Sequence, residues 1–157
     1  MELFYQNMLQ QIRNHPILEN TIISFTKYIP IITFIIYPSI LIYLFITKNT
    51  LLFTTIIKPL ASFVIVTIFR KIINRKRPYE AMNIEPLLTH KAGESFPSRH
   101  TVSAFAIALA CLNVYLPLGI IMLILAFIVS FSRILCGVHY ISDVICAILI
   151  AIFVAIL

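Results

Sequence analysis

Charged residues are scarce in this sequence of 157 residues, at 11% of the total, whereas hydrophobic residues make up 61%. Soluble domains typically carry about 25% charged and about 45–50% apolar residues. A soluble fold of this composition would leave large apolar surfaces in water, so we expect a membrane-embedded chain. Glycine is also rare, with 3 residues, and the 8 prolines are scattered. No linker is therefore apparent, and we expect a single domain over residues 1–157.

Cysteine and acidic residues are few as well. The three cysteines are odd in number and lack the spacing of a metal site, so we expect them to behave as small hydrophobic side chains. Six acidic residues stand against twelve Lys and Arg, which gives a net charge of +6. Most of the basic residues border apolar segments. With so little other polar surface, this placement argues against a nucleic-acid partner and favours a small anionic group or anionic lipid.

Five apolar segments predict an all-α bundle of about five transmembrane helices, at residues 28–47, 51–70, 99–116, 117–133 and 140–157. The last three are short for isolated spans, so we expect them to be extended at their ends or tilted. Residues 71–98 form the one long polar insertion and are expected to be the active-site loop. Residues 1–20 have a roughly helical amphipathic pattern, which predicts an interfacial helix, although a poorly ordered terminus would have the same composition.

If all five segments cross the membrane, four of their ends must lie on the same side. These are the end of the second segment, the start of the third, the end of the fourth and the start of the fifth. Three polar clusters occupy these ends, at residues 70–78, 95–100 and 132–143. They contain nearly every unusual polar residue of the chain. Counting spans therefore predicts that the three clusters form one site.

The third cluster contains a potential nucleophile. His139 and Asp143 are four residues apart, so they lie on one face of a helix that begins near His139. The carboxylate can accept a hydrogen bond from one imidazole nitrogen and leave the other free to attack. Arg133 adds a rigid fork of donors suited to phosphate oxygens. A His–Asp pair alone is a weak signal, but Asp143 is the only aspartate in the chain and borders a membrane segment, where charge is costly.

The second cluster precedes the third span and can form an anion site. If Ser98 or its neighbour caps this helix, the backbone N–H groups of the first turn point toward a bound anion. His100 would lie in that turn, placed to give a proton to a leaving oxygen. An ordinary capped helix with an unrelated histidine would have the same sequence. The first cluster, taken alone, would favour a basic flank that anchors the second span in anionic headgroups.

Together, the three clusters resemble the signature of the type 2 phosphatidic acid phosphatase family of lipid phosphate phosphatases, whose relatives include vanadium haloperoxidases. The signature reads Lys-x6-Arg-Pro, then Pro-Ser-Gly-His, then Ser-Arg-x5-His-x3-Asp. The third motif is matched in full by Ser132, Arg133, His139 and Asp143. The second is matched by Pro97, Ser98 and His100, with Arg99 in place of glycine. The first is matched by Arg77 and Pro78, with Arg70 in place of lysine and Lys71 one residue out of register.

This resemblance implies a phosphatase in which His139 attacks phosphorus and forms a phosphohistidine. Asp143 would orient His139, and His100 would protonate the leaving oxygen and then activate water. A second group of side chains would bind the phosphoryl oxygens. This group comprises Arg70, Arg77, Ser98, Arg99 and Arg133, with Lys71 as a further candidate. The mechanism requires no metal and no cofactor.

Other interpretations of the same residues are weaker. A zinc site built from His90, His100 and His139 has no recognised ligand spacing, and the surrounding arginines would repel a cation. A vanadate-dependent haloperoxidase would use a similar pocket, but those relatives are soluble. A catalytically silent lipid-binding scaffold would be expected to lack the nucleophile or the acid. A transporter would need ionisable groups within the membrane, where only Lys58 lies.

The motif residues indicate that the substrate carries a phosphate group, but they do not identify its lipid tail. Resemblance to small bacterial members implies an integral protein of the bacterial cytoplasmic membrane, surrounded by membrane lipids, with a lipid phosphate as substrate. Undecaprenyl diphosphate is slightly favoured over phosphatidylglycerophosphate and phosphatidic acid. The resemblance also favours a site on the extracytoplasmic face, whereas the Lys and Arg count alone would place it in the cytoplasm. Family members commonly have six spans, so we expect a short version that lacks the first. The oligomeric state stays open.

Overall fold

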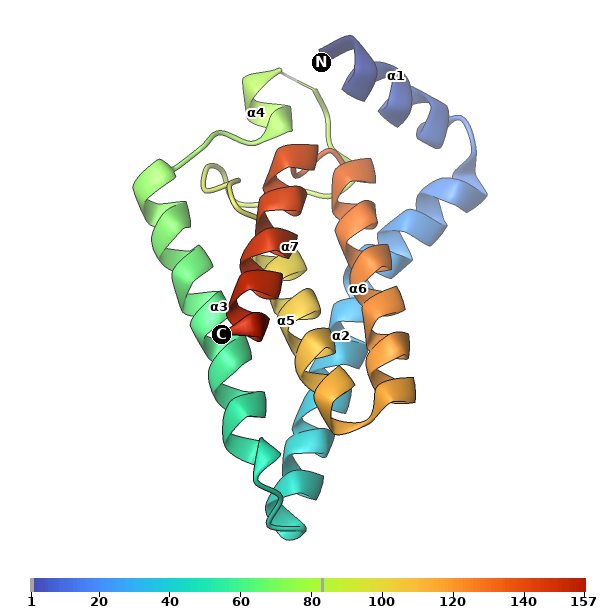
Figure 1. The fold of residues 1–157 in the computed structure, drawn as a ribbon. Helices are drawn as coiled ribbons and strands as arrows, with labels where there is room; N and C mark the ends of the chain where they lie inside the picture. Colours follow the sequence, from blue (N-terminus) through green and yellow to red (C-terminus); the bar gives the residue numbers. More distant parts are fainter. Residues whose placement is uncertain (1, 83) are drawn as a thin grey trace.

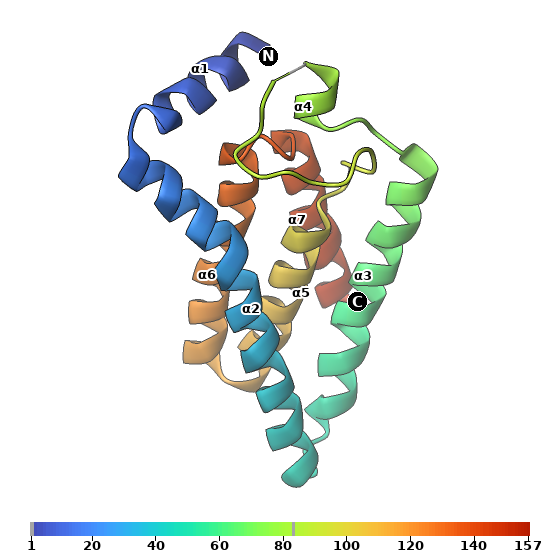
Figure 2. The ribbon, with the colours of Figure 1, turned by 180° about the vertical axis from the view of Figure 1, so that it is seen from behind.

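The computed structural model describes residues 2–82 and 84–157, and all regular structure in these ranges is helical (Figures 1 and 2). The prediction of an all-α fold is therefore confirmed. The helices are α1 (Glu2–Arg13), α2 (Pro16–Ile46), α3 (Leu51–Ile73), α4 (Pro78–Ala81), α5 (Arg99–Val114), α6 (Leu116–Leu135) and α7 (Ile141–Ile156).

The helices α2, α3 and α6 are long and apolar enough to cross a bilayer. The helices α5 and α7 have 16 residues each and are apolar but shorter. Large apolar side chains project outward from the bundle, among them Phe34, Phe53, Phe131 and Phe153, each more than 60% exposed. Such a surface is stable only in lipid. The chain is therefore an integral membrane protein, and crossing by α5 and α7 stays a prediction.

The helix α5 forms the centre of the bundle, in contact with α2, α3, α6 and α7 (Figures 1 and 2). Nine of its residues are buried, and four of these are alanines. Small side chains let neighbouring helices approach closely where no water drives them together. The closest approach is to α6, where Gly119 faces the backbone of Leu112. This packing holds α5 against all four neighbouring helices.

The N-terminal region differs from the prediction of one interfacial helix over residues 1–20. The structure divides it into α1, which ends at Arg13, and the first turn of α2. The break occurs because Pro16 disfavours a helical residue before it and is well suited to the first position of a new helix. The buried face of α1 consists of Tyr5, Leu9 and Ile12, and it packs against protein.

The first long helix also starts earlier than predicted, at Pro16 and not at residue 28. The continuous apolar segment begins only after Glu19 and Lys27, whereas helical structure runs through these polar residues from Pro16. At the other end of the bundle, α2 and α3 meet at the turn of residues 47–50 and diverge toward the polar end (Figure 1).

Lys58, the one basic residue that lies away from the ends of the predicted spans, has a structural partner. Its Nζ atom donates a hydrogen bond to the carbonyl of Ala155 at 2.7 Å. That carbonyl belongs to the last turn of α7, where backbone oxygens have no partner within the helix. The contact joins the first half of α3 to the end of α7.

We expect Gly119→Ala to destabilise the protein by about 1–3 kcal/mol, the usual effect of overpacking. A Cβ atom at this position would overlap the Cα and N atoms of Leu112, which cannot move aside as a flexible side chain would. Thermal unfolding in detergent measures the effect. Ile120→Ala, at the next and lipid-exposed position of α6, is the control. An unchanged melting temperature for Gly119→Ala would contradict the close α5–α6 contact.

Candidate active site

Three hydrogen bonds connect the polar ends of the helices. The amide of Ser98, at the start of α5, donates to the carbonyl of Asp143 in α7 at 3.0 Å. Arg70 Nη1 donates to the carbonyl of Pro97 at 3.0 Å, which joins α3 to the loop before α5. Arg77 Nη1 reaches the carbonyl of Val138, between α6 and α7, at 3.1 Å. The predicted convergence of the three clusters is confirmed by these contacts.

His139 lies at the centre of this region, in the loop between α6 and α7, and is 2% exposed. Its Nδ1 atom is 3.3 Å from Asp143 Oδ2. Within the described residues, the contacts of the ring are all at Nδ1, so Nε2 stays available for chemistry. The backbone carbonyl of His139 accepts a hydrogen bond from Tyr5 Oη at 3.1 Å. The loop is thus held by α7 on one side and by α1 on the other.

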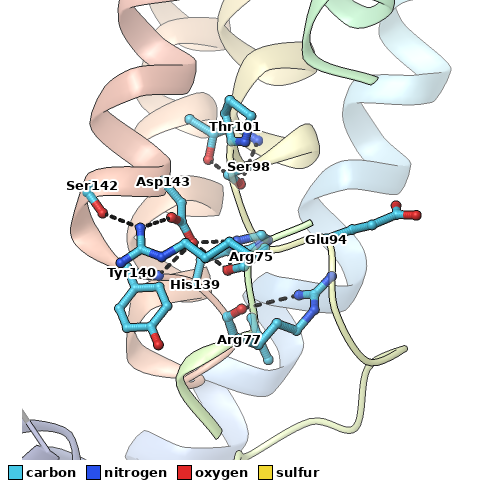
Figure 3. Close-up of polar contacts among 12 residues, drawn as sticks. Arg75, Arg77, Glu94, Ser98, Thr101, His139, Tyr140, Ser142 and Asp143 are labelled. Atoms are coloured by element: carbon cyan, nitrogen blue, oxygen red, sulfur yellow. Dashed lines mark hydrogen bonds and ion pairs between the residues drawn. The ribbon is translucent and has the colours of Figure 1, made fainter. Parts of the chain in front are cut away.

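The carboxylate of Asp143 is completely buried and accepts several hydrogen bonds (Figure 3). Ser95 Oγ donates to Oδ2 at 2.5 Å, and the Tyr140 amide donates to the same oxygen at 3.0 Å. Arg75 Nη1 donates to Oδ1 at 2.9 Å, and its guanidinium lies 3.9 Å from the centre of the Tyr140 ring. A buried carboxylate is tolerated only with such partners. This network keeps Asp143 ionised and fixed beside His139.

Arg75 and Ser95 were not among the predicted site residues, although both lie within or beside the polar clusters. The sequence signals for them were the basic run before Pro78 and the Ser-x-Pro-Ser pattern before α5. These signals do not reveal which side chain turns toward Asp143 and which toward a ligand. Tyr5 gave no signal, because its contact with His139 joins residues 134 positions apart.

Arg70 and Arg77 are buried and held by backbone carbonyls. Arg77 Nε donates to the carbonyl of Gly93 at 3.1 Å, in addition to the bond to Val138. Arg70 Nη2 lies 3.8 Å from Glu94 Oε2. These bonds fix the two guanidinium groups without neutralising them, because carbonyl oxygens carry no net charge and the Glu94 contact is long. The cluster therefore keeps a positive charge that can attract an anion.

The loop of residues 84–98 is held in place by two acceptor side chains, Glu80 and Asn74. Glu80 Oε2 accepts hydrogen bonds from the amides of Arg77 and Gly93, at 2.9 and 2.8 Å. Asn74 Oδ1 accepts from the amide of Glu94 at 3.2 Å. Gly93 has a φ of +71°, a conformation that glycine adopts without strain. The loop is thereby pinned beside the start of α4 and brings Ser95 to Asp143.

Ser98 is the N-cap of α5, as predicted. Its Oγ accepts hydrogen bonds from the Thr101 amide at 3.4 Å and from Thr101 Oγ1 at 2.9 Å. Because the oxygen acts as acceptor in both, its own proton is free to be donated to a ligand. The start of α5 also presents unpaired amides and the positive end of the helix dipole.

Arg99 and His100 line a cavity of about 120 Å³ whose other walls are mostly apolar and come from α2, α3, α5 and α6. The Arg99 guanidinium lies 5.4 Å from the centre of the Phe63 ring of α3. His100 is half-buried at the polar end of the cavity. These two residues mark the border between the polar cluster and an apolar space large enough for part of a hydrocarbon chain.

Lys71 is the one predicted candidate that the structure does not bring to the site. It is exposed on the last turn of α3, whereas its neighbour Arg70 is buried and faces the cluster. Successive helix residues point about 100° apart, so only one of the two can face inward. Arg70 therefore occupies the place of the lysine in the first motif.

Arg133 contacts a histidine outside the three motifs. Its Nη1 atom is 2.9 Å from His90 Nε2, and Nη2 donates to the carbonyl of Thr26 at 3.4 Å. The Nε atoms of Arg70, Arg99 and Arg133 are buried and have no hydrogen-bond partner among the described residues. Unpaired buried donors on three arginines of one cluster indicate a site built for an additional acceptor.

No group of three His, Cys, Asp or Glu side chains is placed to hold a metal ion within residues 2–82 and 84–157. The zinc interpretation therefore finds no ligand set in this part of the chain. His90 and His100 do approach each other, with ring centres 6.2 Å apart, but Arg133 lies directly against His90.

Comparison with known proteins gives consistent matches. The family model of the PAP2 superfamily matches residues 39–157. The bacitracin transport permease protein BcrC of Bacillus licheniformis is 36% identical over 103 residues, which are 62% of this chain and 49% of that protein. The undecaprenyl-diphosphatase BcrC of Bacillus subtilis (strain 168) is 38% identical over 81 residues, 52% of this chain and 42% of that protein. The match thus spans about half the length of these relatives.

Two solved structures share the fold. The crystal structure of Aquifex aeolicus LpxE has a TM-score of 0.76 and 27% identity, and the match covers 96% of this chain and 92% of that one. The crystal structure of a transmembrane PAP2-type phosphatidylglycerolphosphate phosphatase from Bacillus subtilis has a TM-score of 0.71 and 22% identity. That match covers 98% of this chain and 81% of the other. The arrangement of the helices around the site is therefore one that other membrane proteins use.

We expect His139 to stay neutral over the whole physiological range. Burial lowers the pKa of His139 to about 4, although Asp143 acts in the opposite direction; free histidine has a pKa of about 6.5. A lowered pKa means that the proton binds only as the pH falls toward 4, and the neutral form prevails above it. NMR of histidine-labelled protein in detergent, with His139→Gln for assignment, tests this. Titration of the His139 signal near pH 6.5 would contradict it.

Proposed function

Because the chain belongs to the PAP2 superfamily, we propose that it is a membrane-embedded phosphatase that hydrolyses a lipid phosphate or diphosphate through a phosphohistidine at His139. The observation that carries this proposal is the buried His139–Asp143 pair, with the positive charges of Arg70 and Arg77 acting on His139. The matched relatives are only partly covered by this chain, so their names support the proposal without deciding it.

Binding of the anionic phosphate offsets the positive charge around His100, which takes up a proton. In the first chemical step, His139 Nε2 attacks phosphorus, the N–P bond forms and the P–O bond to the leaving group breaks. His100 gives its proton to the leaving oxygen. Asp143 stabilises the positive charge that develops on the imidazole, because its carboxylate lies against Nδ1. The neutral state expected for His139 at pH 7 makes it a competent nucleophile.

In the second step, water attacks the phosphohistidine. His100, now neutral, takes a proton from the water, the new O–P bond forms and the N–P bond breaks. Inorganic phosphate leaves, and both histidines return to their initial states. The negative charge on the phosphoryl oxygens is stabilised in both steps by fixed positive groups and donors. We assign this role to Arg70, Arg77, Arg99, Arg133 and Ser98.

The apolar cavity beside His100 supports a lipid as the leaving group. Its walls include Phe34, Phe63 and Ile107, and a second apolar groove shares these same residues and continues between α2 and α3. We favour undecaprenyl diphosphate as the substrate, since the relative from B. subtilis is named undecaprenyl-diphosphatase. Phosphatidylglycerophosphate and phosphatidic acid are the alternatives. The name of the other relative raises transport as an activity of a different class.

We expect the purified protein in detergent with EDTA to release phosphate from undecaprenyl diphosphate faster than from phosphatidylglycerophosphate or phosphatidic acid. His139→Ala should lower the rate by several orders of magnitude, because it removes the group that forms the covalent intermediate. His15→Ala, an exposed histidine between α1 and α2, is the matched control. Release that survives in His139→Ala would refute the mechanism. No release from any lipid would favour a silent scaffold or a transporter.

We also propose that the chain resides in the bacterial cytoplasmic membrane with the site on the extracytoplasmic face. Lys91→Cys marks the site loop and Thr50→Cys marks the α2–α3 turn, and both positions are exposed at opposite ends of the bundle. In intact cells, a membrane-impermeant maleimide should label Lys91→Cys and leave Thr50→Cys unlabelled. The native cysteines, which are buried or half-buried, set the background. The reverse labelling pattern would place the site in the cytoplasm.

A further inference from the structure

His90 lies outside the three motifs but reaches the arginine cluster from the loop before α5. Arg133 Nη1 is 2.9 Å from its Nε2 atom. A guanidinium group can only donate hydrogen bonds, so Nε2 must be the acceptor and carries no proton. In the proposed mechanism, Arg133 binds a phosphoryl oxygen through this same fork. The imidazole nitrogen of His90 therefore occupies a place that a phosphate oxygen would take.

We propose that His90 is a substrate-contacting specificity residue that binds the phosphate on the leaving side of a diphosphate and so favours diphosphates over monophosphates. This inference rests on the proposed phosphatase function. Its position follows from two contacts: His90 touches Arg133, and its ring centre lies 6.2 Å from that of His100, the residue assigned to the leaving oxygen. His90 thus lies where the leaving group and not the attacked phosphorus is expected.

The chemistry of the two substrate classes differs on this side. When a monophosphate is cleaved, the leaving group is an alcohol, which offers one oxygen and is served by His100. When a diphosphate is cleaved, the leaving group is a lipid monophosphate with additional charged oxygens. A second imidazole beside His100 has a partner only in the second case. The proximity of two histidines thus fits a diphosphate better than a monophosphate.

The same nitrogen can change from acceptor to donor as the substrate binds. A phosphate oxygen that takes the Arg133 Nη1 donor releases His90 Nε2. Because His90 is exposed, Nε2 can take up a proton from solvent and donate it in a hydrogen bond to the leaving phosphate. After the lipid monophosphate leaves, the proton returns to solvent and Nε2 accepts again from Arg133. No bond to His90 is made or broken apart from that proton.

The surroundings of His90 favour this change only when an anion is present. The ionisable groups near it come from five elements besides its own loop: Arg70 of α3, Arg77 and Tyr79 at the start of α4, His100 of α5, Arg133 of α6 and His139 of the α6–α7 loop. The positive charges among them oppose an imidazolium in the empty site. A diphosphate brings several negative charges and reverses that balance.

The backbone of His90 is held independently of its ring. Tyr79 Oη donates to the carbonyl of His90 at 2.9 Å and lies 3.3 Å from that of Lys91. The side chain can therefore move or be replaced while the loop keeps its course. This makes substitution of His90 a test of its chemistry and not of loop folding.

The test uses two substrates with one tail, farnesyl diphosphate and farnesyl phosphate, and the full-length protein in detergent. In His90→Gln, the amide oxygen can still accept from Arg133, but the side chain cannot become a cation. We expect kcat/KM for the diphosphate to fall by about 10-fold to about 100-fold, the contribution of one charge-assisted hydrogen bond. Hydrolysis of the monophosphate should stay within about 2-fold, as for a substitution without a partner. His15→Gln should change neither.

The outcomes separate this proposal from the function on which it rests. Equal losses on both substrates would mean that His90 only supports Arg133, and the specificity proposal would be overturned. No loss on either substrate would overturn it as well. Wild-type protein that releases phosphate from neither substrate would overturn the phosphatase function, and this proposal with it. Hydrolysis by the wild type that His139→Ala abolishes, together with a selective diphosphate defect in His90→Gln, would support both.

Discussion

The buried carboxylate of Asp143 is the group on which the arrangement of the site depends. Taking an ionised carboxylate out of water costs several kcal/mol unless donors surround it, so the fold has to supply them. Ser95, Arg75 and the Tyr140 amide do so, from the loop before α5, the segment after α3 and the start of α7. These donors come from separate parts of the chain. The hydrogen bonds that stabilise the charge of Asp143 therefore also fix the positions of three polar helix ends. The backbone carbonyl of Asp143 adds a fourth tie, to the amide of Ser98.

The arginines around His139 show how positive charge can be concentrated without being neutralised. Arg70 and Arg77 are held mainly by carbonyl oxygens, which orient a guanidinium and leave its charge intact. Only Arg75 is committed to a carboxylate at short distance. A cluster that is rigid before the ligand arrives does not have to reorganise as charge develops, which is the condition for strong electrostatic stabilisation. The apolar cavity beside Arg99 and His100 joins this cluster to the hydrocarbon region.

Much of this arrangement could be predicted from sequence. Hydropathy locates the apolar helices, and counting the spans shows which of their ends lie on the same side of the membrane. The cap at Ser98 and the pairing of His139 with Asp143 follow from local spacing. Local spacing does not predict a contact that joins distant segments. Tyr5 at His139 is one example, and the donors of Asp143 are another. The rotation of α3 about its own axis determines whether Arg70 or Lys71 faces the site, and local spacing does not reveal this rotation. The boundary between α1 and α2 does not follow from the apolar pattern, because Pro16 sets it.

The hydrogen bond from Tyr5 to the carbonyl of His139 joins positions separated by 134 residues, almost the full chain. During synthesis, α1 is made before the loop that carries His139, and α2 to α6 are made between them. The contact between Tyr5 and His139 can therefore form only after α6 has been made. The last of the three polar clusters completes the site. A chain arrested after α5 would hold the first two motifs, yet it would lack both His139 and Asp143.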